Sequence, residues 1–337
     1  MKHKNQIWTG VAAGAVMILL ILDTKTALSG AKEGVLLCIY TVIPSLFPFF
    51  VVSCLINSVL LGKEIAVLRP IGKLCGIPQG AESLLMLGLL GGYPVGAQAV
   101  TDAYSRKLVT KGTAHRLLGF CSNAGPAFIF GMVSSQFAHV SIAWILWGIH
   151  ILSALIVGTI LPQKTEEICR IPIGEPLSLT QALNRSMKTM ANVCGWIVLF
   201  RIILAVLTQW ILWLLPQSLQ VFTTGLLELS NGCLELSRIP ERGTRFVLCA
   251  SFLGFGGLCV GMQTSSAAKD LGTGMYFPGK VLQTLLSFLL AGFAENLVFP
   301  HEERFALPPS LYAITIVSSI LLLLALQRRK KVVAIPC

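Results

Sequence analysis

Polar side chains that could bind a solute stand beside glycines and prolines that interrupt two apolar stretches. The first stretch, residues 88–98, carries four glycines and Pro94 within nine residues and ends at Gln98. The second, residues 256–263, repeats its Gly-Gly, Val-Gly and Gln positions at an offset of 165 and ends at Gln263. Proline removes a backbone donor and glycine frees the backbone to turn, so each stretch predicts a helix break. The helix that starts after a break offers free N–H groups to a polar ligand.

Two interrupted helices at corresponding positions of two halves are typical of the binding sites of secondary transporters. The alternative is that glycine-rich helix packing produces the match and that the glutamines hold the bundle together. We expect the two turns to approach each other inside the membrane. The residues predicted to bind substrate at these turns are Gly92, Gly96, Gln98, Gly257, Gly261 and Gln263.

Two further polar residues stand at predicted breaks in apolar helices. Asn123 begins the sequence Asn-Ala-Gly-Pro, and Ser45 lies between Pro44 and Pro48. Carbonyl groups released by such a break must find partners inside the protein. Asn123 and Ser45 are therefore candidate ligands, and a packing kink is the alternative at both places.

Arg201 lies in the middle of an apolar helix, between Phe200 and Ile202. A guanidinium at this depth costs a few kcal/mol to insert, so it must face the protein interior and have a partner. It either binds a carboxylate of the substrate through two parallel hydrogen bonds or forms an ion pair with Glu228 or Glu295. The secondary candidates for the site are Ser45, Glu228, Asn231, Ser265 and Glu295.

The composition indicates an integral membrane protein. The chain is 54% hydrophobic and 12% charged, with a mean hydropathy of +0.76, whereas a soluble domain has roughly 25% charged residues. We attribute the net charge of +11 to membrane topology and to anionic headgroups of the bilayer, and not to nucleic-acid binding. The ten cysteines form no CxxC pair, which predicts neither a metal site nor a disulfide framework. No catalytic or nucleotide-binding motif is present, so we expect neither enzymatic activity nor a cofactor.

The predicted fold is an all-α polytopic membrane protein with two inverted-topology repeats, each containing a re-entrant helical hairpin, plus one extra N-terminal transmembrane helix. Each hairpin arm has about ten to twelve residues, fewer than the roughly 20 that cross a hydrocarbon core. Each repeat then contains three crossings, and an odd number turns the second repeat upside down. The Lys and Arg residues divide almost equally between the two sides, which leaves the membrane orientation open. The predicted elements are a helix over 7–22, a loop over 23–33, a helix over 35–61, a hairpin over 81–104, helices over 113–135 and 141–161, a short amphipathic helix over 177–187, a helix over 190–215, a hairpin over 245–272, and helices over 279–299 and 309–326.

Four motifs, taken together and in order, resemble a known family. They are residues 43–48 (IPSLFP), 91–96 (GGYPVG), 123–126 (NAGP) and 228–232 (ELSNG). The chain is similar from about residue 5 to 325 to the sporulation integral membrane protein family called YlbJ, within the nucleoside-recognition or Gate domain group. The resemblance implies a spore-forming bacterium and movement of dipicolinic acid, a small aromatic dicarboxylate, across the outer forespore membrane. The second turn has Leu258-Cys259 where the first has Tyr93-Pro94, so a symmetric substrate site is not expected.

The function predicted from the residues and this resemblance is secondary transport of a small anionic solute, with dipicolinic acid as the candidate. A nucleoside-type solute carrier and a non-transporting membrane scaffold needed for spore formation are the alternatives. The expected partners are the solute and the lipid bilayer, with a homo-oligomer or other sporulation membrane proteins left open. The predicted organisation is a transmembrane helix and loop over 1–34, a first Gate-like repeat over 35–162, a polar linker over 163–189, a second, inverted Gate-like repeat over 190–327 and a basic tail over 328–337.

Overall fold

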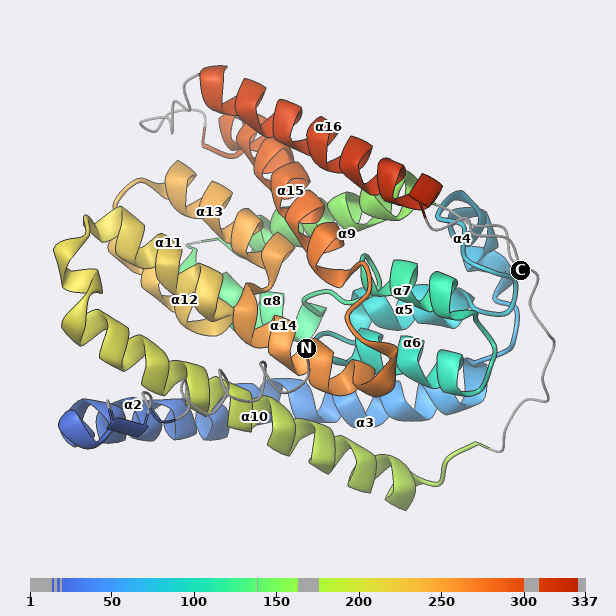
Figure 1. The fold of residues 1–337 in the computed structure, drawn as a ribbon, viewed down its shortest axis with the longest axis horizontal. Helices are drawn as coiled ribbons and strands as arrows, with labels where there is room; N and C mark the ends of the chain where they lie inside the picture. Colours follow the sequence, from blue (N-terminus) through green and yellow to red (C-terminus); the bar gives the residue numbers. More distant parts are fainter. Residues whose placement is uncertain are drawn as a thin grey trace.

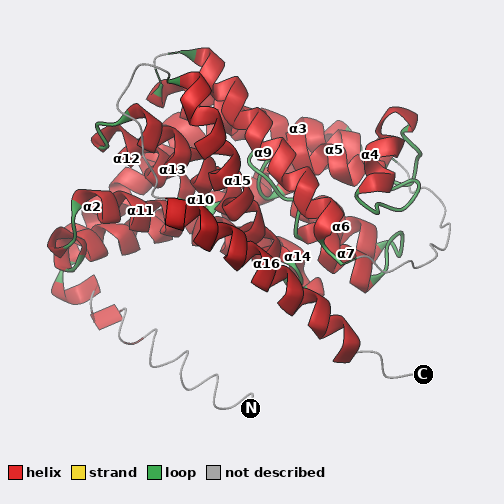
Figure 2. Cartoon of the chain, turned by 90° about the horizontal axis from the view of Figure 1, so that it is seen from above, coloured by secondary structure: helices red, strands yellow, loops and turns green. Residues whose placement is uncertain are grey.

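The protein is an all-α polytopic membrane protein. The computed structural model describes residues 14, 17, 18, 20–137, 139–162, 176–299 and 309–332, so the predicted helix over 7–22 lies mostly outside the described residues. The described chain contains helices and loops and no strand (Figure 2). Five helical stretches in it are long and apolar enough to cross a membrane. These stretches are Thr24–Leu60, Val140–Ile160, Leu179–Trp210, Arg242–Ala268 and Tyr276–Glu295.

The first long stretch joins α2 (Thr24–Leu37), the π-helical segment η1 (Cys38–Val42) and α3 (Ile43–Leu60) without a loop. The loop predicted over 23–33 is therefore wrong. Asp23 begins α2 by accepting a hydrogen bond from the Thr26 amide at 3.3 Å. The π-helical segment directly precedes Pro44 and Pro48, where an irregular turn absorbs the lost backbone hydrogen bonds.

Two glycines on α2 let it pack closely along α10 (Leu179–Trp210). A Cβ built on Gly30 would lie 2.8 Å from the Ala205 Cβ, and one built on Gly34 would lie 3.0 Å from the Val198 Cα. Gly30 and Gly34 stand four residues apart, which is the small-xxx-small spacing of closely packed membrane helices. The polar residues between them suggested a loop, but the glycine spacing is what places this segment in a helix pair.

The polar linker predicted over 163–189 is wrong from Leu179 onward, where α10 begins. The helix starts at Leu179, where Ser178 and Gln181 bond to each other's backbone amide at 3.3 and 2.9 Å and form a capping box. The predicted short helix over 177–187 is thus the first part of the 32-residue α10. In Figure 1, α10 runs beside α2 and α3 along the lower edge of the molecule.

The remaining elements contain the predicted breaks. In the first half, α5 is separated from α6 by residues 91–94, and α7 from α8 by residues 119–125; in the second half, α11 meets α12 at Glu228, and α13 meets α14 at Gly256. The last residues of α5 and α13, Leu90 and Phe255, stand 165 positions apart, which agrees with the offset of the two motifs. The elements are α4 (Arg69–Leu74), α5 (Glu82–Leu90), α6 (Val95–Ser105), α7 (Lys111–Leu118), α8 (Pro126–Gly131), α9 (Val140–Ile160), α11 (Gln217–Leu227), α12 (Leu229–Glu235), α13 (Arg242–Phe255), α14 (Gly257–Ala268), α15 (Tyr276–Val298) and α16 (Pro309–Val332), with short 3-10 segments η2 (Ala66–Leu68), η3 (Val133–Gln136), η4 (Leu212–Leu214), η5 (Leu236–Arg238) and η6 (Lys269–Leu271).

The two broken stretches pack differently. Helices α5 and α6 lie against each other as a hairpin, whereas α13 and α14, both fully described, do not pack along one another. Helix α13 packs against α15 and α9, and α14 packs against α6, α10 and α11. The positions of the breaks thus repeat between the halves while the packing of the arms does not, so the hairpin predicted over 81–104 is confirmed and the one predicted over 245–272 is wrong.

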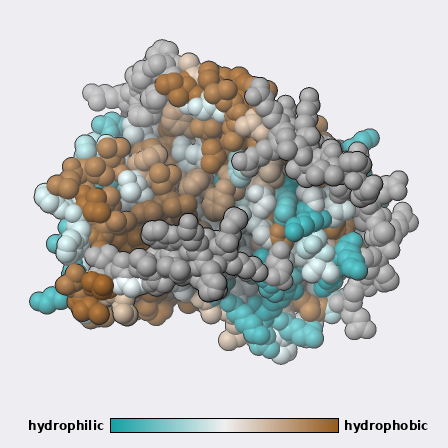
Figure 3. Space-filling model, viewed as in Figure 1, coloured by the Kyte–Doolittle hydropathy of each residue, from teal (hydrophilic) through white to brown (hydrophobic). Residues whose placement is uncertain are grey.

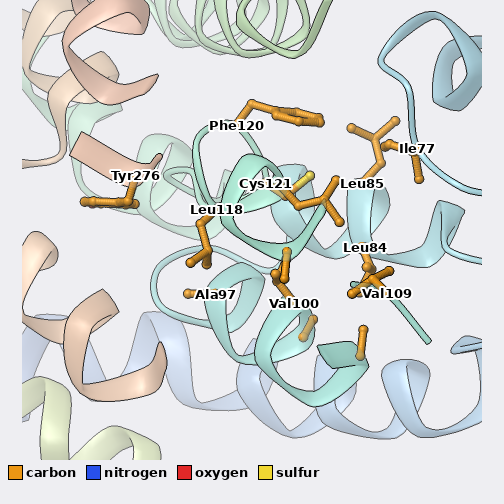
Figure 4. Packing of buried hydrophobic residues seen from close by; sticks show 14 of the residues in the cluster. Ile77, Leu84, Leu85, Ala97, Val100, Val109, Leu118, Phe120, Cys121 and Tyr276 are labelled. Carbon is orange, nitrogen blue, oxygen red and sulfur yellow. The ribbon is translucent and has the colours of Figure 1, made fainter. Parts of the chain in front are cut away.

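Buried apolar side chains form separate clusters on the two sides of the breaks. One cluster lies among α5, α6 and α7 and includes Leu84, Val100, Leu118 and Phe120 (Figure 4). Another lies among α9, α12 and α13, and a third lies between α3 and α10. On the face drawn in Figure 3, hydrophobic side chains cover much of the left and the top, and hydrophilic ones gather at the lower right. The helix breaks lie where the clusters meet.

Candidate functional site

The four helix breaks touch one another. A Cβ built on Gly125 would lie 2.9 Å from the Gly92 nitrogen, so the α7–α8 break lies against the α5–α6 turn. One built on Gly256 would lie 2.9 Å from the Tyr93 hydroxyl oxygen, and one built on Gly257 would lie 3.0 Å from the Leu229 nitrogen. The positive φ angles of Gly92, Gly256 and Gly257, 78°, 82° and 79°, are conformations that favour glycine. The two turns do approach each other, as expected.

A small cavity lies where these breaks meet, and we call it the central cavity. Its free space is about 40 Å³, counted as the volume open to the centre of a water molecule. About 10–15 Å³ by this measure holds one water, so the cavity has room for a few waters and not for an organic solute. A solute therefore binds here only after the walls move. The lining includes Ser45, Gly92, Tyr93, Gly125, Glu228 and Gln263.

Glu228 is the acidic side chain that lines the central cavity, and its carboxylate is hydrogen-bonded to the first residues of α12. Its carboxylate accepts hydrogen bonds from the amides of Ser230 and Asn231 at 3.1 and 2.7 Å and from the Asn231 side chain at 2.7 Å. The side chain is 1% exposed. Free N–H groups at a helix start stabilise a carboxylate. Asn231 thus acts behind the cavity wall by holding Glu228.

Lys280, on α15, lies at the centre of a buried polar cluster beside the same turn. Its ammonium donates to the Asn123 Oδ1 at 2.9 Å and to the Gln283 Oε1 at 2.7 Å, and it lies 5.3 Å from the centre of the Tyr93 ring. The side chain is fully buried. Among the described residues its polar partners are neutral amides, with no carboxylate in hydrogen-bond or ion-pair contact. A buried lysine side chain without an opposite charge is costly to keep protonated, which marks Lys280 as a functional candidate.

Asn123 connects this lysine to the α7–α8 break. Its amide nitrogen donates to the carbonyls of Gly88 and Phe120 at 3.0 and 2.7 Å, and its oxygen also accepts from Gln283 at 3.0 Å. His150, on α9, accepts the Ala124 amide at 3.1 Å through its Nε2. The Phe120 carbonyl and the Ala124 amide, which lie at the break, are thus each hydrogen-bonded to a buried side chain. Asn123 holds the break and the lysine rather than facing the cavity.

Two predicted residues lie in other cavities. Gln98 donates to the Thr189 hydroxyl at 2.8 Å, in a separate small cavity between α3, α6 and α10 that also contains the Arg185–Asp102 ion pair. Arg201 pairs with Glu33 on α2, not with Glu228 or Glu295, and lies in a third cavity. The two predicted partners of Arg201 were therefore wrong, because the loop predicted for Glu33 hid the fact that α2 packs along α10.

Of the remaining predicted residues, Ser45 lines the central cavity and the others serve packing or lie on the surface. Gly96 and Gly261 leave no room for a Cβ, against the Cys121 carbonyl and the Phe277 ring respectively. Ser265 is exposed on α14, and the Glu295 carboxylate lies against Gly243. Ser45 lines the central cavity, and its hydroxyl donates to the Thr41 carbonyl at 2.6 Å. The structure therefore brings together Ser45, Gly92, Glu228 and Gln263 at one cavity, with Asn123, Gly96, Gly257 and Asn231 behind it.

Sequence reasoning missed Lys280 and Gln283. Lys280 stands near the start of a predicted helix, and a lysine there is normally read as a membrane-surface charge. The available signal was Gln283 three residues later, because positions i and i+3 share one helix face. Among the described residues, no group of three or more His, Cys, Asp or Glu side chains is placed to hold a metal ion.

Comparison with known proteins gives one informative similarity. No protein-family profile matches the chain, and no solved structure gives a significant match. The chain is 26% identical over 314 residues to the sporulation integral membrane protein YlbJ of Bacillus subtilis (strain 168), covering 78% of this chain and 76% of that protein. The grouping with Gate domains stays a resemblance of motifs. The similarity along most of both chains supports the assignment of this integral membrane protein to the YlbJ family.

Proposed function

We propose that the protein is a secondary transporter that carries a small anionic solute during spore formation, with dipicolinic acid as the first candidate. The observation that carries the proposal is the buried Lys280 ammonium, whose described polar partners are all neutral. An anionic solute would supply the missing opposite charge. The name of the relative supports the setting in sporulation, and the outer forespore membrane is the proposed location.

The helix breaks support transport over a purely structural role. Broken helices with small residues at their turns are the usual way in which membrane proteins present backbone groups to a solute. Here residues of three breaks, at Gly92, Gly125 and Glu228, line the central cavity, and the ring of Tyr93, which also lines it, has its centre 5.3 Å from the Lys280 nitrogen. A solute would reach Lys280 when Tyr93 turns aside, which is a local rearrangement at a turn rather than a motion of a whole helix.

The test is uptake of labelled dipicolinate into liposomes that contain the purified full chain. We expect uptake by the wild type, a loss of at least about tenfold in Lys280→Gln, and partial retention in Lys280→Arg, which keeps the charge. Lys111→Gln, at an exposed position, is the matched control and should behave as the wild type. Glutamine retains hydrogen-bonding capacity towards Asn123 and Gln283, and thermal unfolding in detergent checks that this variant is folded.

Three outcomes would overturn the proposal. Wild-type uptake equal to that of empty liposomes would favour the membrane scaffold. Inhibition by nucleosides, without inhibition by other aromatic dicarboxylates, would favour the nucleoside-type carrier. Unchanged uptake by Lys280→Gln would remove the assigned role of the lysine.

A further inference from the structure

A second, larger polar cavity lies between α2, α10, α11, α12 and η5, and we call it the vestibule. It has about 320 Å³ open to the centre of a water molecule, far more than the central cavity. Its walls carry two ion pairs, Arg201–Glu33 and Arg238–Glu235, and Gln220 accepts a hydrogen bond from Arg238 at 3.3 Å. The sequence marked Arg201 for a functional role, and the central site does not use it.

The vestibule extends from the membrane surface into the apolar layer. Trp210 and Trp213, at the end of α10 and in η4, are 50% and 65% exposed, and exposed tryptophans are typical of the membrane–water boundary. The Trp210 indole donates to Asp23 at 2.9 Å and lowers the pKa of that carboxyl, which ties the ends of α10 and α2 together at this level. Arg201 precedes Trp210 by nine residues, about 14 Å along the helix. Charged groups at such a depth need water or an opposite charge.

The vestibule and the central cavity are stacked along the same helices. On α10, Arg201 lines the vestibule and Ile197, one turn earlier, lines the central cavity. Thr224 on α11 lines the vestibule, and Glu228, one turn later, lines the central cavity. One helical turn is about 5 Å. The two spaces are therefore separated by a thin layer of protein.

That layer is apolar. Ile197 belongs to a buried cluster against which Leu37 and Leu227 pack. In the sequence, each of these two leucines lies between a residue that lines the vestibule and a residue that lines the central cavity. Leu37 lies between Glu33 and Thr41, and Leu227 lies between Thr224 and Glu228. Three apolar side chains between two polar spaces form a barrier to water and to charged solutes.

We propose that the vestibule is the aqueous entrance of the solute path and that Leu37, Ile197 and Leu227 form the closed barrier between it and the central cavity. This inference rests on the proposed transport function. Because each guanidinium of the vestibule already holds a carboxylate, a carboxylate solute binds there only by exchange with Glu33 or Glu235, whose own carboxylate then faces the water of the vestibule. The vestibule thus offers weak, exchangeable binding of carboxylates on their way inward.

Cysteine labelling tests the path without measuring transport. Single cysteines are placed at Thr224 in the vestibule, at Ser230 in the central cavity and at Leu199, a 43% exposed position on the apolar face of α10. The full chain in liposomes is treated on both sides with a charged thiol reagent, and labelling is followed by mass spectrometry against the wild type, whose native cysteines give the background. We expect labelling at Thr224→Cys at least about tenfold faster than at Leu199→Cys, and none at Ser230→Cys.

A second substitution tests the barrier. Ile197→Ala, combined with Ser230→Cys, should make the central cysteine reactive, since it removes the largest part of one barrier side chain and enlarges the central cavity, which Ile197 also lines. Equal, slow labelling at Thr224→Cys and Leu199→Cys would overturn the aqueous vestibule. Fast labelling at Ser230→Cys in the otherwise unchanged chain would overturn the barrier. The predicted labelling pattern without dipicolinate uptake would contradict the proposed solute while leaving the path intact, so the two failures are distinguishable.

Discussion

The Tyr93 hydroxyl stands directly over Gly256, so that a Cβ built on this glycine would lie 2.9 Å from the hydroxyl oxygen. Tyr93 belongs to the α5–α6 turn, and Gly256 is the break between α13 and α14. One aromatic side chain therefore joins the two breaks that the sequence relates by a constant offset. The same ring faces the Lys280 side chain and lines the central cavity. The packing at Gly256 therefore also holds the Tyr93 ring in its place beside the lysine and the cavity.

Substitution at this contact should show coupling between the two residues. Gly256→Ala places a side chain at a φ of +82° and against Tyr93, and we expect a loss of about 2–4 kcal/mol in unfolding free energy. Tyr93→Phe removes a buried hydroxyl that has no hydrogen-bond partner among the described residues, so its effect should be within about 0.5 kcal/mol. The unfolding midpoint in detergent provides the measurement.

The double variant decides whether the contact is the cause. Tyr93→Phe combined with Gly256→Ala should recover about 0.5–1 kcal/mol of the loss, because the closest atom is gone and the strained φ remains. Additive effects of the two changes would mean that Tyr93 does not limit the space at Gly256.

Two glycines that lie in helices provide a matched pair. Gly96 packs against the Cys121 carbonyl and has no room for a Cβ, whereas Gly195 on α10 has no neighbour within 4 Å of a built Cβ. Gly96→Ala should cost about 1–3 kcal/mol because the α5–α6 hairpin must move away from the α7–α8 break. Gly195→Ala should be neutral or stabilise by up to about 1 kcal/mol through helix propensity. Equal unfolding midpoints for the two variants would contradict close packing at Gly96.

The sequence predicted the breaks better than the continuous helices. Breaks at residues 91–94, 119–125 and 256 follow from glycine and proline chemistry, which acts on the local backbone and can be read from composition. The continuity of α2 with α3, and of 179–189 with the rest of α10, depends on packing between segments far apart in the sequence, such as Arg201 with Glu33 and Arg185 with Asp102, which are 168 and 83 residues apart. Local polarity suggested loops there, and tertiary contacts decided otherwise.

The site residues differ in the same way: those at local breaks could be predicted, and those paired across distant elements could not. Ser45, Gly92 and Gln263 were candidates because each stands at or near a local break, and Glu228 was one because it could pair with Arg201. The structure places all four at one cavity. Lys280 and Glu33 could not be placed, since their partners Asn123 and Arg201 lie on elements far away in the sequence. Side-chain pairing across helices depends on helix rotation and packing, which the polar pattern of a single sequence does not determine.

Substitution of the buried Arg116 should lower stability far more than substitution of the exposed Lys111 on the same helix. It is 5% exposed and donates to the carbonyls of Cys75, Gly76, Gly158 and Leu161 at the ends of α4 and α9. Helix C-termini carry a partial negative charge and unpaired carbonyls, which a guanidinium satisfies. Arg116→Met should therefore cost about 3–5 kcal/mol by leaving buried carbonyls unpaired. Lys111→Ala, at the exposed start of the same helix, should change the unfolding midpoint little, and a comparable loss there would contradict a specific role for Arg116.

Glu228 should contribute to stability mainly as the cap of α12. Glu228→Ala removes the acceptor of three hydrogen bonds and should cost about 2–4 kcal/mol, as a lost helix cap plus buried unpaired donors. Glu228→Gln retains one acceptor oxygen and should cost about half as much. Equal losses in Glu228→Gln and Glu228→Ala, by unfolding midpoint, would indicate that the negative charge itself, and not the capping geometry, stabilises the folded chain.

Exchanging the charges of Arg201 on α10 and Glu33 on α2 should show that these two side chains pair with each other. Arg201 pairs with Glu33, and both side chains are partly exposed in the vestibule, at 26% and 49%, so the pair itself contributes at most about 1 kcal/mol. Arg201→Glu alone brings two carboxylates together and should lower the unfolding midpoint and the yield of folded protein, as should Glu33→Arg with two cations. The exchanged double variant restores an opposite-charge pair and should recover most of the yield, which size-exclusion chromatography measures. If Arg201 instead bound Glu228 or Glu295, the exchange with Glu33 would give no recovery, and the packing of α2 along α10 would lose its electrostatic support.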